Sequence, residues 1–132
     1  MEQLEPYRQF LDSVLAMRAV PMRKDCASQV PAEQGVYVVS DHSLDGNPVI
    51  YVGRTKSGNL RSRLTSCHLS GDLMSARIKA GLVRCGTCQD NPAARVYVES
   101  NCRAGFDEIA DESSRRFTEH FLTAYFRPSL NA

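Results

Sequence analysis

The middle of the chain is basic and the stretch after it is acidic, a combination that suits phosphate chemistry. From Arg54 to Arg84 there are seven cations and one anion, Asp72, so this segment carries a formal charge of +6. Its cations are Arg54, Lys56, Arg61, Arg63, Arg77, Lys79 and Arg84, and the acidic stretch holds Glu99, Asp107, Glu108, Asp111, Glu112 and Glu119. Such a pairing could hold a phosphate backbone beside a metal-binding carboxylate. On charge alone, two solvated faces that offset one another are the favoured interpretation.

Four short features have residue types and an order that could do chemistry. They are Gly35-Val36-Tyr37, Tyr51-Val52-Gly53 followed by Arg54, Leu60 to Leu64 with Arg61 and Arg63, and Glu119 with Asn131 beyond it. Singly, each has a structural explanation. Tyrosine is common in strands, and arginine on a helix is usually solvated. Glu119 could simply pair with Arg115 or Arg116, which are helical neighbours.

Three segments are predicted to be strands that would position these side chains. Residues 35–40 and 49–53 are rich in β-branched and aromatic residues, and Asp45-Gly-Asn-Pro between them favours a turn. These two segments are expected to form a hairpin. Residues 94–99 alternate between apolar and polar side chains and are predicted to be a third strand.

Four helices are predicted around these strands. Residues 3–20 have amphipathic spacing and end at Pro21, and a helix from Leu60 to Cys67 is expected to be capped by Asn59 or Ser57. Another begins at Asp72, with Leu73, Ile78, Leu82 and Ala76 facing inward, and is expected to end near Gly81 or Gly86. The last runs from Phe106 to Phe126 and stops before Pro128. Its predicted apolar face consists of Ile109, Phe117, Phe121, Leu122 and Tyr125.

The four features, in this order, resemble the GIY-YIG nuclease family. The resemblance covers about residues 34 to 131, with valine at the isoleucine position of both signatures. It implies an α+β fold with a small three-stranded, mainly antiparallel sheet flanked by helices, here with an extra N-terminal helix. The expected organisation is an N-terminal helix and connection over residues 1–33 and a nuclease-like domain over residues 34–132.

Two arginines compete for the position of the family's catalytic arginine. The usual number of residues between the second tyrosine and the arginine of the family, counted from Tyr51, leads to Arg61. The loop after Tyr51 looks about two residues longer than usual in this chain, so the arginine could instead be Arg63. The local pattern of leucine, two residues, arginine and leucine selects Arg63. Helix phase decides which side chain faces the sheet, so Arg63 is preferred.

The resemblance also implies a role for each site residue. Tyr37 is expected to be the general base, with a neighbouring cation such as Arg54 lowering its pKa. Tyr51 would orient the water or the phosphate, and Arg63 would hold the phosphate through its planar donors. Glu119 would be the protein ligand of Mg²⁺ or Mn²⁺.

Supporting roles are expected for Arg54, Arg61, His68 and Asn131. Arg54 could instead be a second phosphate contact, and Asn131 would position a tyrosine or Glu119. A histidine near the position of His68 assists catalysis or contacts phosphate in some family members. A solvent-facing histidine at a helix end is the more ordinary interpretation.

The implied function is a metal-dependent DNA endonuclease, and the residues themselves do not exclude RNA as the substrate. The alternatives are a nucleic-acid-binding module without turnover, or a subunit of a larger DNA-processing complex. The helix at residues 3–20 could then be a docking element or a homodimer contact. Only about 30 residues lie outside the core resemblance, so structure-selective or weakly specific cleavage is expected.

The remaining properties bound the class of protein. The chain has 132 residues with 42% hydrophobic and 23% charged side chains, as expected for one globular domain. Its N-terminus does not resemble a signal peptide and no apolar run reaches about 18 residues, which predicts a cytoplasmic location without a membrane span. Five cysteines favour free thiols, although Cys85 and Cys88 form a CxxC that could be half of a zinc site.

Overall fold

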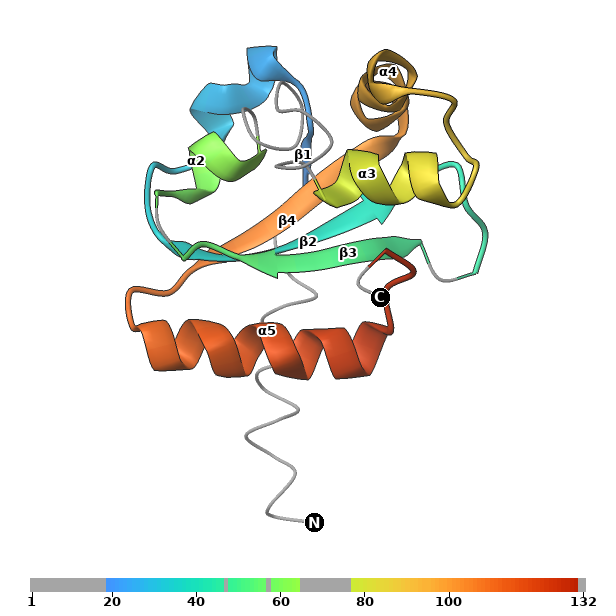
Figure 1. Ribbon diagram of the computed structural model, residues 1–132. Coiled ribbons are helices and arrows are strands. Elements are labelled where there is room, and N and C mark those ends of the chain that lie inside the picture. The colour runs from blue at the N-terminus through green and yellow to red at the C-terminus, as the bar shows by residue number, and fades with distance from the viewer. Residues whose placement is uncertain (1–18, 47, 57, 65–76, 131–132) are drawn as a thin grey trace.

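The computed structural model describes residues 19–46, 48–56, 58–64 and 77–130 (Figure 1). In chain order the elements are β1 (Val20–Pro21), the 3₁₀ helix η2 (Lys24–Gln29), β2 (Gly35–Asp41), β3 (Val49–Arg54), α2 (Leu60–Ser62), α3 (Arg77–Arg84), α4 (Asn91–Asn101), β4 (Cys102–Glu108) and α5 (Glu112–Phe126). Residues 3–18 of the predicted N-terminal helix lie outside the described residues, and its predicted end at residue 20 was wrong, because Val20 belongs to β1. His68, Asn131 and the predicted start of the helix at Asp72 also lie outside the described residues.

The strands form one antiparallel sheet in the order β1-β4-β2-β3. The hairpin predicted from residues 35–40 and 49–53 is confirmed as β2 and β3. The expectation of three strands was too low, because β1 adds a fourth by pairing Val20 with Ala104. In the centre of the sheet, Tyr37 lies between Gly53 on one neighbouring strand and Phe106 on the other.

The third predicted strand, residues 94–99, was wrong, because this segment lies within α4. Asp90 caps the helix by accepting a hydrogen bond from the Ala93 amide at 2.9 Å, and a proline occupies its first turn. Ala94 and Val98, four residues apart, are buried, whereas Val96 is 64% exposed. The apolar residues therefore follow a helical period, and the alternation in the sequence was misleading.

The strand that was missed, β4, follows α4 directly and occupies the expected beginning of the last helix. The C-terminal helix, predicted to begin at Phe106, begins instead at Glu112. Asp111 sets this start, because its carboxylate accepts a hydrogen bond from the Ser114 amide at 2.8 Å. The end predicted at Phe126 is confirmed.

The face of α5 that packs on the sheet also differs from the prediction. Arg115, Thr118 and Leu122 are its buried residues. Phe117 and Tyr125, expected on the apolar face, are 56% and 53% exposed. The inward positions are spaced three and four residues apart, as one helical face requires.

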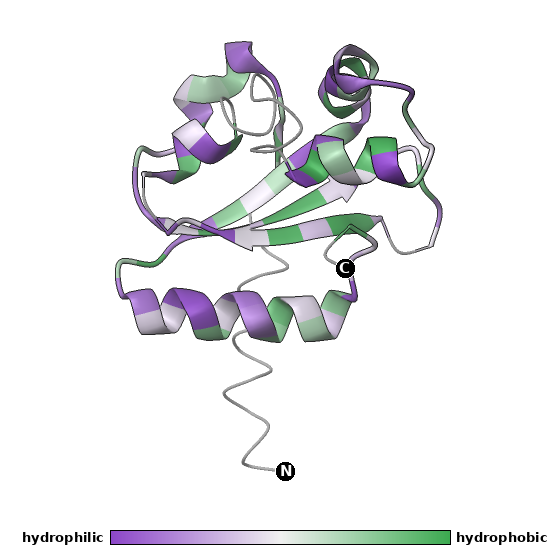
Figure 2. Ribbon diagram, in the orientation of Figure 1, coloured by the Kyte–Doolittle hydropathy of each residue, from purple (hydrophilic) through white to green (hydrophobic). Residues whose placement is uncertain are grey.

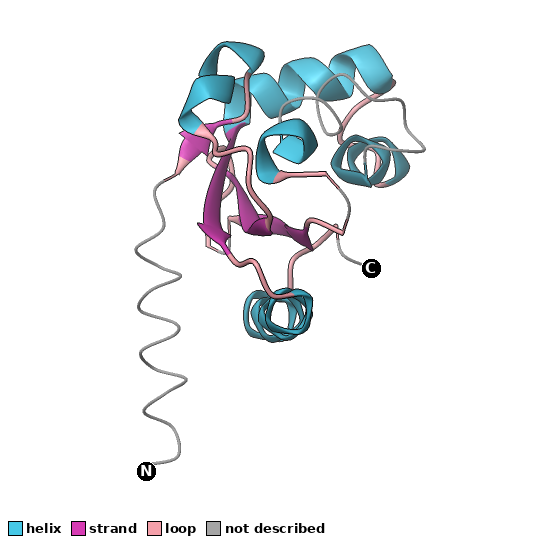
Figure 3. Ribbon diagram, turned by 90° about the vertical axis from the view of Figure 1, so that its left-hand side faces the viewer, coloured by secondary structure: helices cyan, strands magenta, loops and turns pink. Residues whose placement is uncertain are grey.

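Helices cover both faces of the sheet (Figures 1 and 3). Figure 3 shows α5 on one side of the sheet and the other described helices on the opposite side. Alternate residues of β2 divide between the two cores. Val36 and Val38 pack with Leu122 beneath α5, and Tyr37 and Val39 belong to the larger core on the other face. The hydrophobic colouring of β2 and β3 in Figure 2 fits strands covered on both sides.

Residues assigned to the N-terminal unit take part in this larger core. Met22, Cys26 and Val30 are buried in the same cluster as Tyr37. The described part of residues 1–33 therefore shares one core with the rest of the chain. None of the described helices is long and apolar enough to cross a membrane.

The helices beside the hairpin agree with the prediction where they are described. Asn59 caps α2, accepting a hydrogen bond from the Ser62 amide at 2.9 Å. Ile78 and Leu82 of α3 are buried as expected. The helix end predicted at Gly81 or Gly86 corresponds to the last residue of α3, Arg84.

Gly53 and Gly35 permit two close approaches within the sheet. A Cβ atom on Gly53 would overlap the phenol ring of Tyr37, which lies across from it on β2. A Cβ atom on Gly35 would overlap the backbone carbonyl of Asp107 on β4. Both glycines are therefore required by packing, irrespective of any chemistry.

We expect Gly53→Ala to lower the free energy of unfolding by about 1–3 kcal/mol, the usual cost of overpacking a core. Chemical denaturation of the two proteins measures the difference. In a Tyr37→Val background the same substitution should cost much less, because the overlapping phenol is gone. An equal cost in both backgrounds would show that Tyr37 does not impose the glycine.

Candidate functional site

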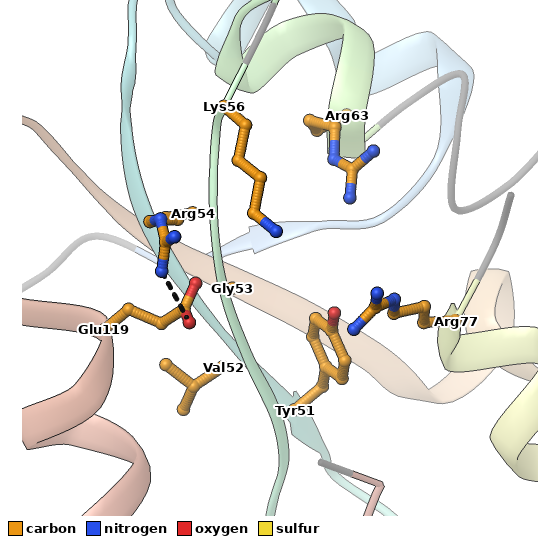
Figure 4. A pocket seen from close by; sticks show the side chains of 8 residues that line it. All are labelled: Tyr51, Val52, Gly53, Arg54, Lys56, Arg63, Arg77 and Glu119. Atoms are coloured by element: carbon orange, nitrogen blue, oxygen red, sulfur yellow. Dashed lines mark hydrogen bonds and ion pairs between the residues drawn. The ribbon is translucent and has the colours of Figure 1, made fainter. Parts of the chain in front are cut away.

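A polar cleft of about 230 Å³ opens where β3, α2, α3 and α5 come together (Figure 4). Its lining consists of Tyr51, Val52, Gly53, Arg54, Lys56, Arg63, Arg77 and Glu119. Four residues predicted for the site, Tyr51, Arg54, Arg63 and Glu119, are thus brought together from three separate elements. Tyr37 and Arg61 are not among the residues that line the cleft.

Glu119 enters the cleft from the middle of α5 and meets Arg54 at the end of β3. Nη1 of Arg54 lies 3.0 Å from Oε1 of Glu119, and the two side chains are 15% and 21% exposed. Arg54 was expected to act beside Tyr37 or on a phosphate. In the structure it holds the carboxylate instead.

Arg115, one turn before Glu119, fixes the position of α5 on the sheet. Its buried guanidinium donates to the carbonyl oxygens of Thr55, Ile109 and Ala110 at 3.2, 3.0 and 2.6 Å. The suggested pairing of Glu119 with Arg115 is therefore replaced by this anchor. Because Arg115 ties the helix to the residue that follows β3, it sets how Glu119 faces the end of that strand.

The two signature tyrosines lie on neighbouring strands with their rings 6.2 Å apart and nearly parallel, at 26°. Tyr51 reaches the cleft, whereas Tyr37 is completely buried beneath it. Burial raises the pKa of the Tyr37 phenol, and the neighbouring Tyr51 raises it further, against the opposing effect of a hydrogen bond from Arg63. Burial also raises the pKa of Tyr51, opposed by Arg77 and Arg63.

These pKa directions change the expected role of Tyr37. A neighbouring cation was expected to lower its pKa, and Arg54 was the candidate. The cation beside Tyr37 is Arg63, and burial outweighs it, so the Tyr37 phenol is neutral in the free protein at ordinary pH. In this state the Tyr37 phenol is an uncharged neighbour of the Arg63 guanidinium.

The two competing arginines point to different places. Arg63 lies in the cleft and contacts Tyr37. Arg61 points away, and its Nε donates to the carbonyl oxygen of Val30 at 2.8 Å. Two residues correspond to about 200° around a helix axis, so Arg61 and Arg63 lie on nearly opposite faces, and it is Arg63 that faces the cleft.

Two residues of the cleft, Lys56 and Arg77, were not singled out in the sequence. Lys56 follows β3 by two residues, and Arg77 is the first residue of α3. Both belong to the basic segment, which was the available signal. Its charge does not indicate which of seven cations converge, because α3 is brought to the cleft by tertiary packing.

Among the described residues, the lining of the cleft has four cations, Arg54, Lys56, Arg63 and Arg77, against one carboxylate, Glu119. The formal charge of this described lining is therefore +3, which favours an anionic ligand. Among the described residues, no three acidic, histidine or cysteine side chains gather as a metal cluster. A single carboxylate is nevertheless compatible with Mg²⁺, which retains several waters and also takes ligands from a substrate phosphate.

The CxxC segment lies apart from the cleft. Cys85 is exposed and Cys88 is buried, and all the described cysteines are free thiols. A hydrogen bond with Thr87 lowers the pKa of the Cys85 thiol, whereas burial raises that of Cys88. The described residues offer no zinc cluster around the pair.

The buried phenol of Tyr37 predicts alkaline destabilisation. Its folded pKa is raised, so above about pH 10 the unfolded chain ionises first and the free energy of unfolding falls. In Tyr37→Phe the free energy of unfolding should fall less steeply with pH than in the wild type. The difference is at most about 1.4 kcal/mol per pH unit, the value for one proton. Urea denaturation between pH 8 and 11 measures both slopes, with the exposed Tyr125→Phe as control. Equal slopes for Tyr37→Phe and the wild type would contradict the assigned burial.

No protein-family model matches the chain, and no significant match was found among characterised proteins or solved structures.

Proposed function

We propose that this protein is a metal-dependent endonuclease of the GIY-YIG type that hydrolyses phosphodiester bonds in DNA. The observation that carries the proposal is the convergence of Tyr51, Arg63 and Glu119 in one basic cleft. They come from a strand, a helix and the last helix, and they match the order of the family's signature residues. Packing of the hydrophobic core does not explain why an arginine, a glutamate and a tyrosine hydroxyl share one cleft, which supports a functional reason for their convergence.

The cleft has the charges that phosphodiester hydrolysis needs. A phosphodiester is anionic and gains charge at its oxygens in the transition state, so fixed cations favour the reaction. Arg63 is the proposed phosphate-binding side chain, because its guanidinium lies in the cleft with Tyr51 and its charge acts on the buried Tyr37 phenol. A preorganised guanidinium loses little entropy when it receives the phosphate.

Glu119 is the proposed protein ligand of Mg²⁺ or Mn²⁺. When bound, the metal ion would offset charge on the phosphate and assist the leaving oxygen. Arg54 engages one carboxylate oxygen of Glu119 at 3.0 Å and orients the carboxylate in the free protein. Arg54 thus positions Glu119 and is available to the substrate if the carboxylate turns to a metal ion.

The two tyrosines have different proposed roles because only Tyr51 lines the cleft. The Tyr51 hydroxyl can orient a water molecule or a phosphate oxygen. Tyr37 is the general-base candidate of the family resemblance, but its neutral, buried phenol supports a positioning role through Arg63. Of the two tyrosines only Tyr51 contacts the cleft, and burial raises its pKa as well, so removal of the water's proton by this phenol depends on the opposing effect of Arg77 and Arg63.

A nucleic-acid-binding module without turnover is the second candidate. The ion pair between Arg54 and Glu119 favours it, since this pair occupies the carboxylate in the free protein. The +3 charge of the cleft would serve binding equally well. A role in a larger complex or a homodimer, through residues 3–20, is compatible with either candidate.

Nicking of supercoiled plasmid by the purified chain tests the proposed activity. We expect nicking with Mg²⁺ or Mn²⁺ and none with a chelator. Glu119→Gln should lower the rate by at least about 100-fold, because several kcal/mol of transition-state stabilisation are lost with the metal ligand.

Glu112→Gln is the matched control, because Glu112 is an exposed glutamate two turns earlier on the same helix. Its rate should stay within about twofold of the wild type, as expected for a surface charge. Binding without nicking under both metals would favour the second candidate. Equal nicking by Glu119→Gln and the wild type would remove the metal-ligand role.

The two arginines of α2 and its C-terminal turn give a second test. Arg63→Ala should reduce the rate by about 100- to 1,000-fold, the usual effect of removing one fixed donor for a developing anion. Arg61→Ala should change the rate little, but it loses a hydrogen bond to Val30 and should cost about 1 kcal/mol of stability. A larger rate loss in Arg61→Ala than in Arg63→Ala would reverse the assignment.

A further inference from the structure

Arg77 extends the cleft beyond the residues that the family resemblance assigns. It is the first residue of α3, an element on the opposite side of Tyr51 from Glu119 (Figure 4). Its guanidinium points into the cleft toward the Tyr51 hydroxyl, and its charge counters the effect of burial on the pKa of Tyr51. Arg63 and Arg77 thus reach the same tyrosine from two different helical segments.

The charge of the cleft exceeds what one phosphodiester group requires. Arg54 is paired with Glu119, yet Lys56, Arg63 and Arg77 also line the same space. A single phosphodiester carries one negative charge. A cleft of formal charge +3 is therefore better matched by a strand that presents consecutive phosphates.

Arg77 has donors to offer to such a strand. A guanidinium carries five N–H groups, whereas the Tyr51 hydroxyl has two lone pairs to accept them. Residue 77 is exposed, so the guanidinium is reachable from solvent. Contact with Tyr51 holds its planar donors at the wall of the cleft, which suits recognition of a phosphate oxygen pair.

We propose that Arg77 binds the phosphate next to the scissile one, so that the cleft engages at least two consecutive phosphates of a DNA strand. This inference depends on the proposed function and deepens it. Arg63 holds the reacting phosphate, and Arg77 fixes its neighbour along the strand. Substrates with a single phosphodiester are then poor, because they cannot use Arg77.

The salt dependence of DNA binding tests this role separately from catalysis. The full chain is titrated with a labelled duplex oligonucleotide in chelator, at several salt concentrations, so that binding is measured without cleavage. Losing one phosphate contact lowers the slope of log affinity against log salt by about 0.9. We expect this decrease and a weaker affinity for Arg77→Ala, and a slope close to the wild type for Arg77→Lys.

Arg84→Ala is the matched control, since Arg84 is an exposed arginine at the other end of α3 and outside the cleft. It should leave the slope unchanged. A role of Arg77 confined to positioning Tyr51 predicts instead that Arg77→Ala keeps the wild-type slope.

Two results would overturn the inference while leaving the proposed function standing. One is DNA binding by Arg77→Ala with the wild-type slope, and the other is an equal loss in Arg84→Ala, which would reflect overall charge alone. If the wild-type chain binds no DNA at low salt, the proposed function fails and the inference fails with it.

Discussion

The packing of Tyr37 on Gly53 is the constraint on which the cleft depends. The tyrosine lies at the centre of the sheet, completely buried, and its ring occupies the space that any side chain at residue 53 would need. This contact joins β2 to β3 and brings the Tyr37 phenol to Arg63. The packing of Gly53 on Tyr37 thus determines the position of the phenol that lies beneath Arg63 in the cleft.

A second set of contacts brings the carboxylate to the same place. Thr55, directly after β3, exchanges hydrogen bonds with the backbone of Gly35 at the start of β2. Its own carbonyl oxygen accepts a hydrogen bond from Arg115 on α5. One buried residue therefore links both hairpin strands to the last helix. Because the anchor is a single turn from Glu119, small shifts of the helix would move the carboxylate relative to Arg54.

The sequence predicted correctly those features that depend on interactions between residues close together in the chain. The hairpin, the cap at Asn59 and the inward face of α3 follow from strand propensity, capping chemistry and helical spacing. The apolar residues of segment 94–99 are compatible with both the two-residue period of a strand and the period of a helix. The cap at Asp90 and the proline in the first turn favour the helix. The convergence of Arg63 and Glu119 was foreseen from the order of the motifs. The participation of Arg77 and the neutral state of Tyr37 depend on tertiary packing, which no local pattern encodes.

The proposed reaction of this cleft is the hydrolysis of a phosphodiester by water. Cleavage of a labelled duplex oligonucleotide in ¹⁸O-enriched water with Mg²⁺, followed by mass spectrometry of the products, tests this most directly. We predict one solvent oxygen on the phosphate at each cut, because the proposed attacking group is water. An oligonucleotide that stays intact under Mg²⁺ and Mn²⁺, or products whose phosphates carry no solvent oxygen, would contradict the account.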